Sequence, residues 1–298
     1  MTGRLSSELL GFGPADRVLL VNADDLGMHP AINEAVFAGL ADGIVRSTSL
    51  MTVCPGTEQA LAMLRRRADT PAGVHLTLVR DRPGDDWRPT APVERVASLV
   101  DATGRFPEQT SPSWSVRDLR IEHVEIEFRA QLASVLRTEV RPTHLDFHCL
   151  ADGGRHDILD VATGLAAEHG LAVRIWLEPG LGRARAAGLP VVDHPFLDSF
   201  GIRPGGKADH YERLLRELPA GLTEWAVHPA VRGTGTAEAS GSRVRTGDHD
   251  FLVSPRARRV IDEEGIELIG YDALQPVWRR RRDGVQRRAA AGRPQSRP

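Results

Sequence analysis

The sequence predicts an α/β protein folded as a single (β/α) barrel of the TIM type. Three observations lead to this prediction: strand-like and helix-like segments alternate along the chain, eight strand candidates recur, and no change of composition divides the body. Strands that alternate with helices favour a parallel sheet. The same order also suits an open, doubly wound sheet, which the order of elements alone does not exclude.

The expected strands are short runs rich in Val, Ile and Leu, bounded by polar or turn residues. They cover residues 17–23, 47–53, 73–78, 143–149, 172–177, 190–194, 223–228 and 266–271. The expected helices repeat apolar residues three or four positions apart. They cover residues 30–42, 57–67, 116–137, 156–169, 207–218 and 255–264. Residues 79–115 interrupt the alternation after the third strand, and since long loops are usually functional, we expect them to overhang an active site.

Composition indicates an ordinary globular protein, because 41% of its 298 residues are hydrophobic and 26% are charged. No apolar run is long enough to span a bilayer, and residues 1–13 lack the apolar segment of a signal peptide. Cys54 and Cys149 do not make a disulfide framework. We therefore expect a cytoplasmic protein with no membrane partner, and a homo-oligomer is left open.

Charge is spread unevenly along the chain. The net charge is −2, yet residues 277–298 hold eight arginines and one aspartate, a balance of +7 that leaves −9 for the rest. This segment also lacks a repeating apolar pattern. We expect residues 1–276 to form the folded domain and residues 277–298 a disordered basic tail. The acidic body has no matching basic patch, so we expect no nucleic-acid partner.

Two adjacent carboxylates, Asp24 and Asp25, follow an apolar run at the end of the first strand. Strand ends are where α/β enzymes carry their chemistry. Neighbouring residues there point in different directions, so one carboxylate can bind a metal while the other handles a proton. The alternative is that one aspartate only caps the next helix.

Several of the eleven histidines lie at or near other strand ends. In a barrel these ends converge on one face. Asp25, His75 and His148 then form an Asp-His-His triad. Two imidazoles and one carboxylate leave coordination positions open for water and substrate, which is the arrangement of a catalytic metal site.

The fourth strand carries further polar groups. His144, Asp146 and His148 alternate, so their side chains share one face. Asp146 could orient a ligand histidine, or it could pair with Arg174 in a structural role. His144 could join the metal or form hydrogen bonds within the site. Cys149 faces the other way by the same alternation, which argues against it as a ligand.

Four short motifs occur in order within residues 18–271: Asn22-Ala23-Asp24-Asp25-Leu26-Gly27, Gly73-Val74-His75-Leu76-Thr77-Leu78, Pro142-Thr143-His144-Leu145-Asp146-Phe147-His148 and Val227-His228-Pro229. The ordered set resembles the motifs of the YdjC/ChbG-like carbohydrate deacetylases. The resemblance implies a distorted (β/α) TIM-like barrel. It also implies a metal-dependent hydrolase that removes N-acetyl groups from an amino sugar or oligosaccharide.

The resemblance also implies roles for individual residues. The metal ligands would be Asp25, His75 and His148. Asp24 would be the general base and His228 the acid, whereas Arg174 matches a further polar position of less clear role. Amide hydrolysis needs an activated water and a protonated leaving amine, which this set supplies. One divalent metal is implied; Zn²⁺ suits two imidazoles and a carboxylate, and Mg²⁺, which prefers more oxygen ligands, is the alternative.

One departure from the family concerns the rim of the site. Many members continue the fourth-strand motif with a run like His-x-His-x-His, whereas here Cys149 and Leu150 follow. The substrate therefore need not be the chitin-derived disaccharide associated with some relatives. Trp87 and Trp114, in the long insertion, could stack on a sugar or could pack as apolar groups.

Two other functions stay open. Another metal-dependent barrel enzyme, such as a sugar isomerase or a phosphoesterase, would also place His and Asp at strand ends. An isomerase usually needs a catalytic lysine, and Lys207 is the only lysine in the chain. A non-catalytic sugar-binding relative is the second alternative. The presence of both Asp24 and Asp25 argues against it, because binding alone needs no proton acceptor beside a metal.

Overall fold

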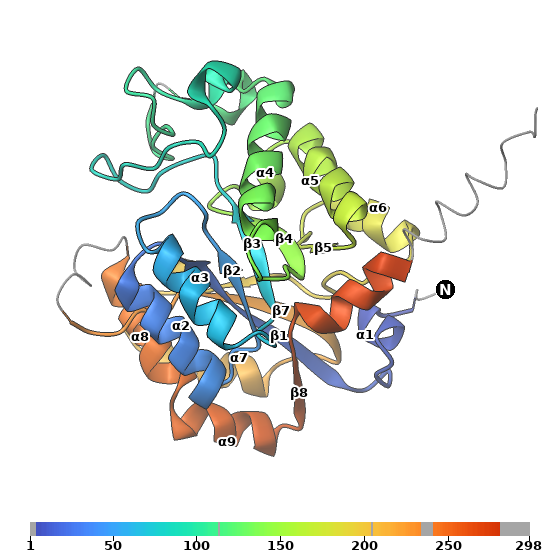
Figure 1. Cartoon of the computed structure of the whole chain (residues 1–298). Coiled ribbons are helices and arrows are strands. Elements are labelled where there is room, and N and C mark those ends of the chain that lie inside the picture. Colours follow the sequence, from blue (N-terminus) through green and yellow to red (C-terminus); the bar gives the residue numbers. More distant parts are fainter. Residues whose placement is uncertain (1–3, 113, 204, 234–240, 281–298) are drawn as a thin grey trace, which may run out of the picture.

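The computed structural model describes residues 4–112, 114–203, 205–233 and 241–280. Its strands form one curled parallel sheet with helices packed around it (Figure 1). The strands are β1 (Arg17–Leu26), β2 (Ser47–Leu50), β3 (Ala72–Leu76), β4 (His144–Phe147), β5 (Ala172–Val173), β6 (Leu197–Asp198), β7 (Gly221–Val227) and β8 (Ile266–Ile269). The helices are α1 (Ser6–Leu9), α2 (Pro30–Asp42), α3 (Thr57–Arg66), α4 (Ile121–Leu136), α5 (His156–His169), α6 (Gly180–Ala186), α7 (Lys207–Arg216), α8 (Ser242–Leu252) and α9 (Pro255–Glu263). A last helix covers residues 271–280.

The order of the strands decides between the two folds that suit the sequence. It runs β5-β4-β3-β2-β1-β7-β6, with β8 also paired to β1. Strands β1 to β5 follow one another in a single direction, as they do around a barrel, whereas a doubly wound sheet reverses its direction at a switch point. The expected distorted (β/α) barrel is therefore confirmed.

The distortion of the barrel is centred on β1. Along one side of this strand, residues 17–23 pair with β7. On its other side, residues 17–20 pair with β8, and β2 takes over from Asn22 onward. No ladder among the described residues joins β5 to β6, so the curled sheet is open there. The apolar run 18–21 has no exposed surface, as expected for a central strand covered on both faces.

The expected strand at residues 190–194 is wrong, because the sixth strand is β6, a few residues later. Asp193 explains the difference. Its carboxylate accepts hydrogen bonds from the backbone N–H groups of Ser6, Ser7 and Leu222, so this segment anchors α1 and β7 through a side chain. A strand ladder would instead pair the backbone groups of both partners throughout.

The helices differ from expectation in two ways. The expected helix at residues 116–137 is broken: Val116–Asp118 form a short 3₁₀ turn, Leu119 and Arg120 are extended, and α4 begins at Ile121. Helices α1, α6 and α8 were not expected from the sequence. Two of them are short, and α8 has a polar composition in which the apolar repeat is weak, so local periodicity did not reveal them.

The insertion after β3 is a packed layer over α4. Buried Glu127 on α4 accepts hydrogen bonds from the backbone N–H groups of Thr90 and Ala91, at 2.9 Å each. Arg80 reaches across the same layer to the carboxylate of Asp101 at 2.7 Å. Trp87 is 3% exposed and belongs to the hydrophobic core, so the apolar-packing alternative holds for this side chain.

The expected boundary between the folded domain and the tail, at residue 277, lies too early in the chain. Residues 277–280 continue the last helix, and Trp278 is buried, with its indole N–H donating to the carbonyl oxygen of Pro190 at 3.0 Å. Its ring lies beside α5 and α6, where it completes an apolar surface with Leu159, Ile175 and Leu189. Residues 281–298, the rest of the expected tail, lie outside the described residues.

Trp278 gives a test of this boundary. We expect Trp278→Ala to lower the free energy of unfolding by about 3 kcal/mol, because it removes a large buried ring and its hydrogen bond. A chain that ends after Arg280 keeps the ring and should unfold at the same denaturant concentration as the full chain. Urea titration followed by circular dichroism measures both. Equal stability of Trp278→Ala and the wild type would contradict the burial of this ring.

Candidate active site

A cavity of about 490 Å³ opens at the carboxyl ends of the parallel strands. Polar residues reach it from β1, β3 and β6 and from the segments that follow β3, β4, β5 and β7. Its lining includes Asp24, Asp25, His75, Asp81, Gln109, Thr110, His148, Cys149, Asp152, Arg174, Trp176, Phe196, Asp198, Phe200, His228 and Arg245. Gln109 and Thr110 come from the insertion, which therefore borders the cavity as expected. This face is where barrel enzymes hold their catalytic groups.

A β-bulge at the end of β1 brings both adjacent aspartates to the cavity. In a regular strand Asp24 and Asp25 would point to opposite faces. Here the register with β2 shifts between Ala23 and Leu26, and Asp25 has a φ of 66°, in the left-handed region that non-glycine residues rarely adopt. Gly27, with a φ of 95°, completes the turn. Backbone strain of this kind is concentrated at functional sites.

Three donor atoms of the expected triad converge. The Asp25 Oδ1 atom lies 3.4 Å from His75 Nε2 and 3.2 Å from His148 Nδ1. All three donor atoms lie within 4.8 Å of one another, and all three side chains are buried. The sequence therefore predicted which residues meet here, and their spacing is small enough for one ion to contact all three.

Each member of the triad is held by a further charged group. His75 Nδ1 lies 2.9 Å from Asp146, and His148 Nε2 lies 2.8 Å from Asp81. The second carboxylate oxygen of Asp25, Oδ2, accepts a hydrogen bond from Arg245 at 2.6 Å. Histidines that bind metals usually engage a carboxylate with their second ring nitrogen, which fixes the direction of the first. The donor set and its surroundings therefore fit a divalent metal.

Asp81 and Arg245 were missed by reasoning from the sequence. Asp81 lies in the insertion, and Arg245 lies on α8, which was not expected to be a helix. Neither residue belongs to a local pattern that marks it. Only the packing of these segments against the strand ends brings them to Asp25 and His148.

The charges at the site favour a cation. Burial alone would lower the pKa of His75, but the negative charge of Asp146 and hydrogen bonds to Asp146 and Asp25 raise it to about 9. Burial alone would raise the pKa of Asp25, but Arg245 and the two histidines hold it well below its usual value. Five carboxylates meet two guanidinium groups here: Asp24, Asp25, Asp81, Asp146, Glu224, Arg174 and Arg245. The imidazoles must be neutral to bind a metal, and the carboxylates then outnumber the guanidinium groups, which suits a divalent ion.

Asp24 is held as a carboxylate beside the triad. Arg174 binds it through two hydrogen bonds, of 2.7 and 2.9 Å, and Asn22 adds a third at 2.7 Å. Burial raises the pKa of Asp24, yet the charge and hydrogen bonds of Arg174 outweigh burial and lower it. Asp24 is therefore ionised and fixed in direction, as a proton acceptor must be.

Arg174 connects the polar groups behind the cavity. Besides Asp24, it contacts Asp146 at 2.9 Å and Glu224 at 2.7 Å. Both interpretations of Asp146 thus hold in the structure, because this carboxylate pairs with Arg174 and also contacts His75. Glu224 in turn accepts hydrogen bonds from the hydroxyl of Tyr271.

His144 points away from the triad. Its ring stacks on Tyr271 with the centroids 3.6 Å apart, and its nitrogens lie 2.9 Å from Thr143 and 3.1 Å from Ser49. Burial lowers its pKa to about 3, so the ring is neutral. A Cβ atom at Gly73 would come within 2.5 Å of this ring, so only glycine fits there. Of the two roles considered for His144, the structure shows the hydrogen-bonded one.

His228 lines the same cavity as the triad. Its Nε2 atom is 3.9 Å from Asp24, and its Nδ1 atom is 2.9 Å from the hydroxyl of Ser199. The backbone N–H of His228 donates to Asp248 at 2.9 Å. Asp248 also binds Lys207 and the Tyr211 hydroxyl, so a buried charged network holds the end of β7 in place.

This network gives a matched pair of variants on α8. Asp248→Ala leaves Lys207 buried without its carboxylate, so we expect the free energy of unfolding to fall by about 3 kcal/mol or more. Asp250→Ala removes the exposed ion pair with Arg232 and a 3.9 Å contact with His249, and we expect a loss of less than about 1 kcal/mol. Thermal and urea denaturation measure both. Equal losses in the two variants would show that the Asp248 network does not support the fold.

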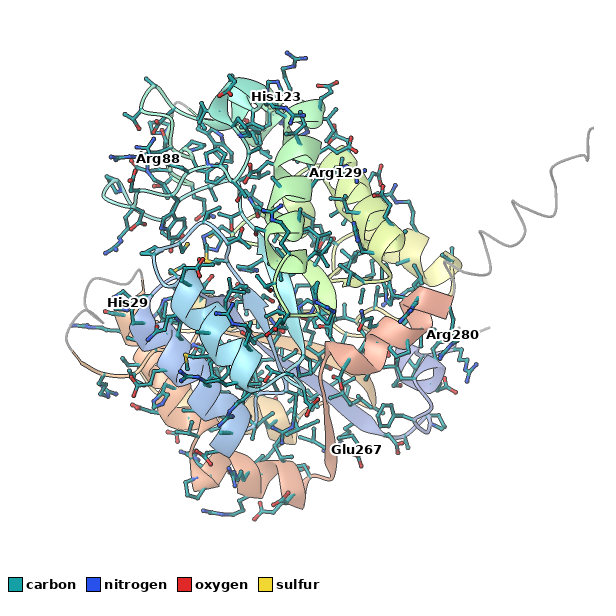
Figure 2. All side chains as sticks on the ribbon, in the orientation of Figure 1. His29, Arg88, His123, Arg129, Glu267 and Arg280 are labelled. Atoms are coloured by element: carbon teal, nitrogen blue, oxygen red, sulfur yellow. The ribbon has the colours of Figure 1, made fainter. Side chains whose placement is uncertain are left out.

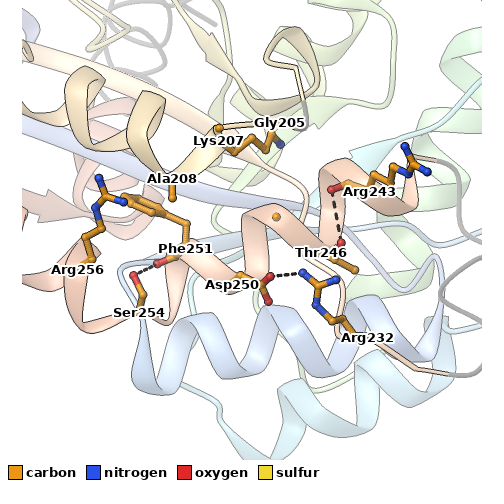
Figure 3. A pocket seen from close by; sticks show the side chains of 12 residues that line it. Gly205, Lys207, Ala208, Arg232, Arg243, Thr246, Asp250, Phe251, Ser254 and Arg256 are labelled. Carbon is orange, nitrogen blue, oxygen red and sulfur yellow. Dashed lines mark hydrogen bonds and ion pairs between the residues drawn. The ribbon is translucent and has the colours of Figure 1, made fainter.

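A second cavity, of about 600 Å³, lies against α7, α8 and the start of α9 (Figure 3). The charged groups in it are largely paired, because Arg232 contacts Asp250 and Arg256 contacts Asp209 and Glu212. The histidines labelled in Figure 2, His29 and His123, lie at the periphery and do not line the first cavity. Among the described residues, the groups expected from the sequence to serve as acid, base and metal donors line the first cavity.

Comparison with known proteins identifies the family. A family model described as YdjC-like protein matches residues 18–263, most of the chain. The chain belongs to the YdjC-like family. The resemblance seen in its motifs is thereby confirmed. No helix within the described part of this family member is long and apolar enough to cross a membrane.

Members with curated names cover the same region. A carbohydrate deacetylase of Thermoanaerobacter pseudethanolicus is 32% identical over 262 residues, which cover 87% of this chain and all of that protein. One of Clostridium beijerinckii is 33% identical over 255 residues, 85% of this chain and 98% of that protein. A chitooligosaccharide deacetylase of Serratia marcescens is 26% identical and covers 87% of this chain and 100% of its own length.

A solved structure shares the fold. The crystal structure of a putative cellobiose-phosphate cleavage protein from Enterococcus faecalis V583 superposes with a TM-score of 0.73 at 27% identity. The match covers 87% of this chain and 99% of that protein. The open, distorted barrel described above is therefore shared with this protein over most of the chain.

Proposed function

We propose that this protein is a metal-dependent hydrolase that removes N-acetyl groups from an amino sugar or oligosaccharide. The observation that carries the proposal is the meeting of three kinds of group in one cavity: the donor triad, the fixed carboxylate of Asp24, and the imidazole of His228. The names of the relatives, carbohydrate deacetylase and chitooligosaccharide deacetylase, support the choice of reaction.

Each group in the cavity has its own role in the proposed reaction. Asp25, His75 and His148 would hold one divalent metal, whose Lewis acidity activates water and polarises the acetyl carbonyl. Asp24 accepts the proton of the attacking water, while Arg174 keeps its carboxylate ionised and aimed at the cavity. His228 lines the same cavity and gives a proton to the leaving amine. The products are acetate and the free amino sugar.

Zn²⁺ is the metal that the donor set favours, because two imidazoles and one carboxylate suit it. Mg²⁺ is the alternative, although it prefers a shell of oxygen ligands. Asp81 and Asp24 are further carboxylates near the triad and are the residues through which a harder ion would gain oxygen ligands.

Aromatic side chains at the cavity supply a surface for a sugar. Trp176 and Phe196 stack with their ring centroids 4.8 Å apart, and Phe200 lies with its edge against His228 at 4.6 Å. Sugar rings bury their C–H faces on such rings. These residues, and not the buried Trp87, are therefore the candidates for sugar stacking. The homo-oligomeric state and the cytoplasmic location stay predictions.

The test is acetate release from a panel of N-acetylated mono- and oligosaccharides, combined with the metal content of the purified protein. We expect acetate from at least one substrate, activity that a chelator removes, and activity that Zn²⁺ restores. Binding of a sugar without acetate release would support the non-catalytic alternative. Release of phosphate or isomerised sugar instead of acetate would support another metal-dependent barrel enzyme.

A further inference from the structure

Cys149 lies at the cavity in a position that strand alternation did not predict. It directly follows His148, but its backbone is left-handed, with a φ of 59°, so its side chain turns back toward that histidine. The Cys149 Sγ atom lies 3.3 Å from His148 Nε2 and 3.7 Å from Asp81 Oδ1. The expectation that Cys149 faces away from the metal ligands is therefore wrong.

Asp81, His148 and Cys149 form a second group of metal donors. Zinc binds cysteine sulfur at about 2.3 Å and imidazole nitrogen or carboxylate oxygen at about 2.0–2.2 Å, which places donor atoms in a tetrahedral shell roughly 3.3–3.6 Å apart. The two distances from Cys149 are close to this range. The third, 2.8 Å between Asp81 Oδ1 and His148 Nε2, needs to lengthen by about half an ångström to reach it.

The two donor groups share one imidazole ring. His148 directs Nδ1 toward Asp25 and Nε2 toward Asp81 and Cys149, so ions in the two groups would contact opposite nitrogens of the same ring. Cys149 is exposed and lines the cavity, so the second position is open to solvent and to a further ligand.

We propose that Asp81, His148 and Cys149 bind a second, thiophilic divalent ion, joined to the first metal site through the His148 ring. This second-site proposal depends on the proposed function in one respect: His148 is also a ligand of the metal proposed for the deacetylase reaction. The cysteine selects ions that accept sulfur, such as Zn²⁺, Co²⁺ or Cd²⁺, over Mg²⁺. Binding releases the thiol proton of Cys149 and the proton on Nε2 of His148 to solvent.

This second ion is inhibitory. It occupies part of the cavity wall, and it replaces the hydrogen bond that His148 Nε2 donates to Asp81, which directs His148 toward the first metal. Excess Zn²⁺ should therefore slow the enzyme through Cys149, whereas excess Mg²⁺, which does not bind sulfur, should not do so.

The test uses Co²⁺ as a spectroscopic probe of the full-length protein. We expect the wild type to bind two equivalents, one of which produces the sulfur-to-cobalt charge-transfer absorption. Cys149→Ala should bind one equivalent without this absorption, and Asp81→Ala should weaken the absorbing site at least about tenfold. Cys54→Ala is the matched control, because Cys54 is buried, contacts the sulfur of Met51 and belongs to neither donor group, and it should retain both equivalents.

The outcomes separate this proposal from the proposed function. A wild type without the sulfur absorption, or a Cys149→Ala variant that keeps it, overturns the second site. Asp25→Asn should weaken the other equivalent and leave the absorption intact. If no acetylated sugar is hydrolysed and the absorption is present, the deacetylase proposal fails while the second site stands. Equal inhibition by excess Zn²⁺ in wild type, Cys149→Ala and Cys54→Ala overturns the inhibitory role.

Discussion

Asp24→Asn is expected to keep its metal and to lose turnover by about a hundredfold or more. The amide has the size of the carboxylate and can still accept a hydrogen bond from Arg174, but it does not accept the proton of the attacking water. The measurement is kcat for acetate release together with metal content per chain. The loss should be in kcat rather than in substrate binding.

Asp152→Asn is the control at the same cavity. Its carboxylate accepts hydrogen bonds only from the backbone N–H groups of Trp176 and Leu177 among the contacts described, and an amide oxygen can accept them too. Asn also tolerates the left-handed backbone that Asp152 adopts. We expect this variant to keep kcat within a few-fold. If metal-loaded Asp24→Asn turns over normally, Asp24 is not the general base, although the family assignment still holds.

Replacing Asp25, His75 or His148 by Ala should remove the metal bound at the triad from a folded protein. Each variant deletes one of the three converging donors and leaves only two of them for the ion. Asp25→Asn should lose metal affinity first, and added metal should restore part of its activity. Metal content by mass spectrometry, with circular dichroism for the fold, measures the effect.

His123→Ala is the matched control for the histidine variants. His123 lies on α4, contacts the hydroxyl of Ser98 and is not among the residues that line the cavity. We expect this variant to keep full metal content. If all three triad variants bind as much metal as His123→Ala does, the assignment of the triad is contradicted.

The proposed base and the metal site depend on one another through Arg174. This buried guanidinium binds Asp24, Asp146 and Glu224 at once, and Asp146 contacts the ligand His75. Removing Arg174 would therefore leave several buried carboxylates without their shared counter-charge, which is far more costly than losing one surface ion pair. A variant of Arg174 consequently does not separate the roles of Asp24 and Asp25, whereas the amide variants do.

Local patterns in the sequence were sufficient to predict the barrel and the residues of the candidate triad. The apolar run 18–21 is buried in β1 because a strand covered on both faces needs no polar residue. His75 lies near the end of β3 and His148 directly follows β4, so the parallel pairing of these two strands brings both imidazoles to the same edge of the sheet. Arg174 and His228 were reached in the same way, from the ends of β5 and β7.

Only the tertiary structure decided the contacts that no local sequence pattern encodes. The left-handed residues Asp25 and Cys149 turn side chains in directions that strand alternation does not give. Asp81 and Arg245 reach the triad from a loop and from a helix that were not part of any motif. Trp278 became part of the core because α5 and α6 offer it an apolar surface. The physical reason is common to all of them: periodicity reports which face of an element is buried, whereas the partner that meets this face depends on segments distant in the chain.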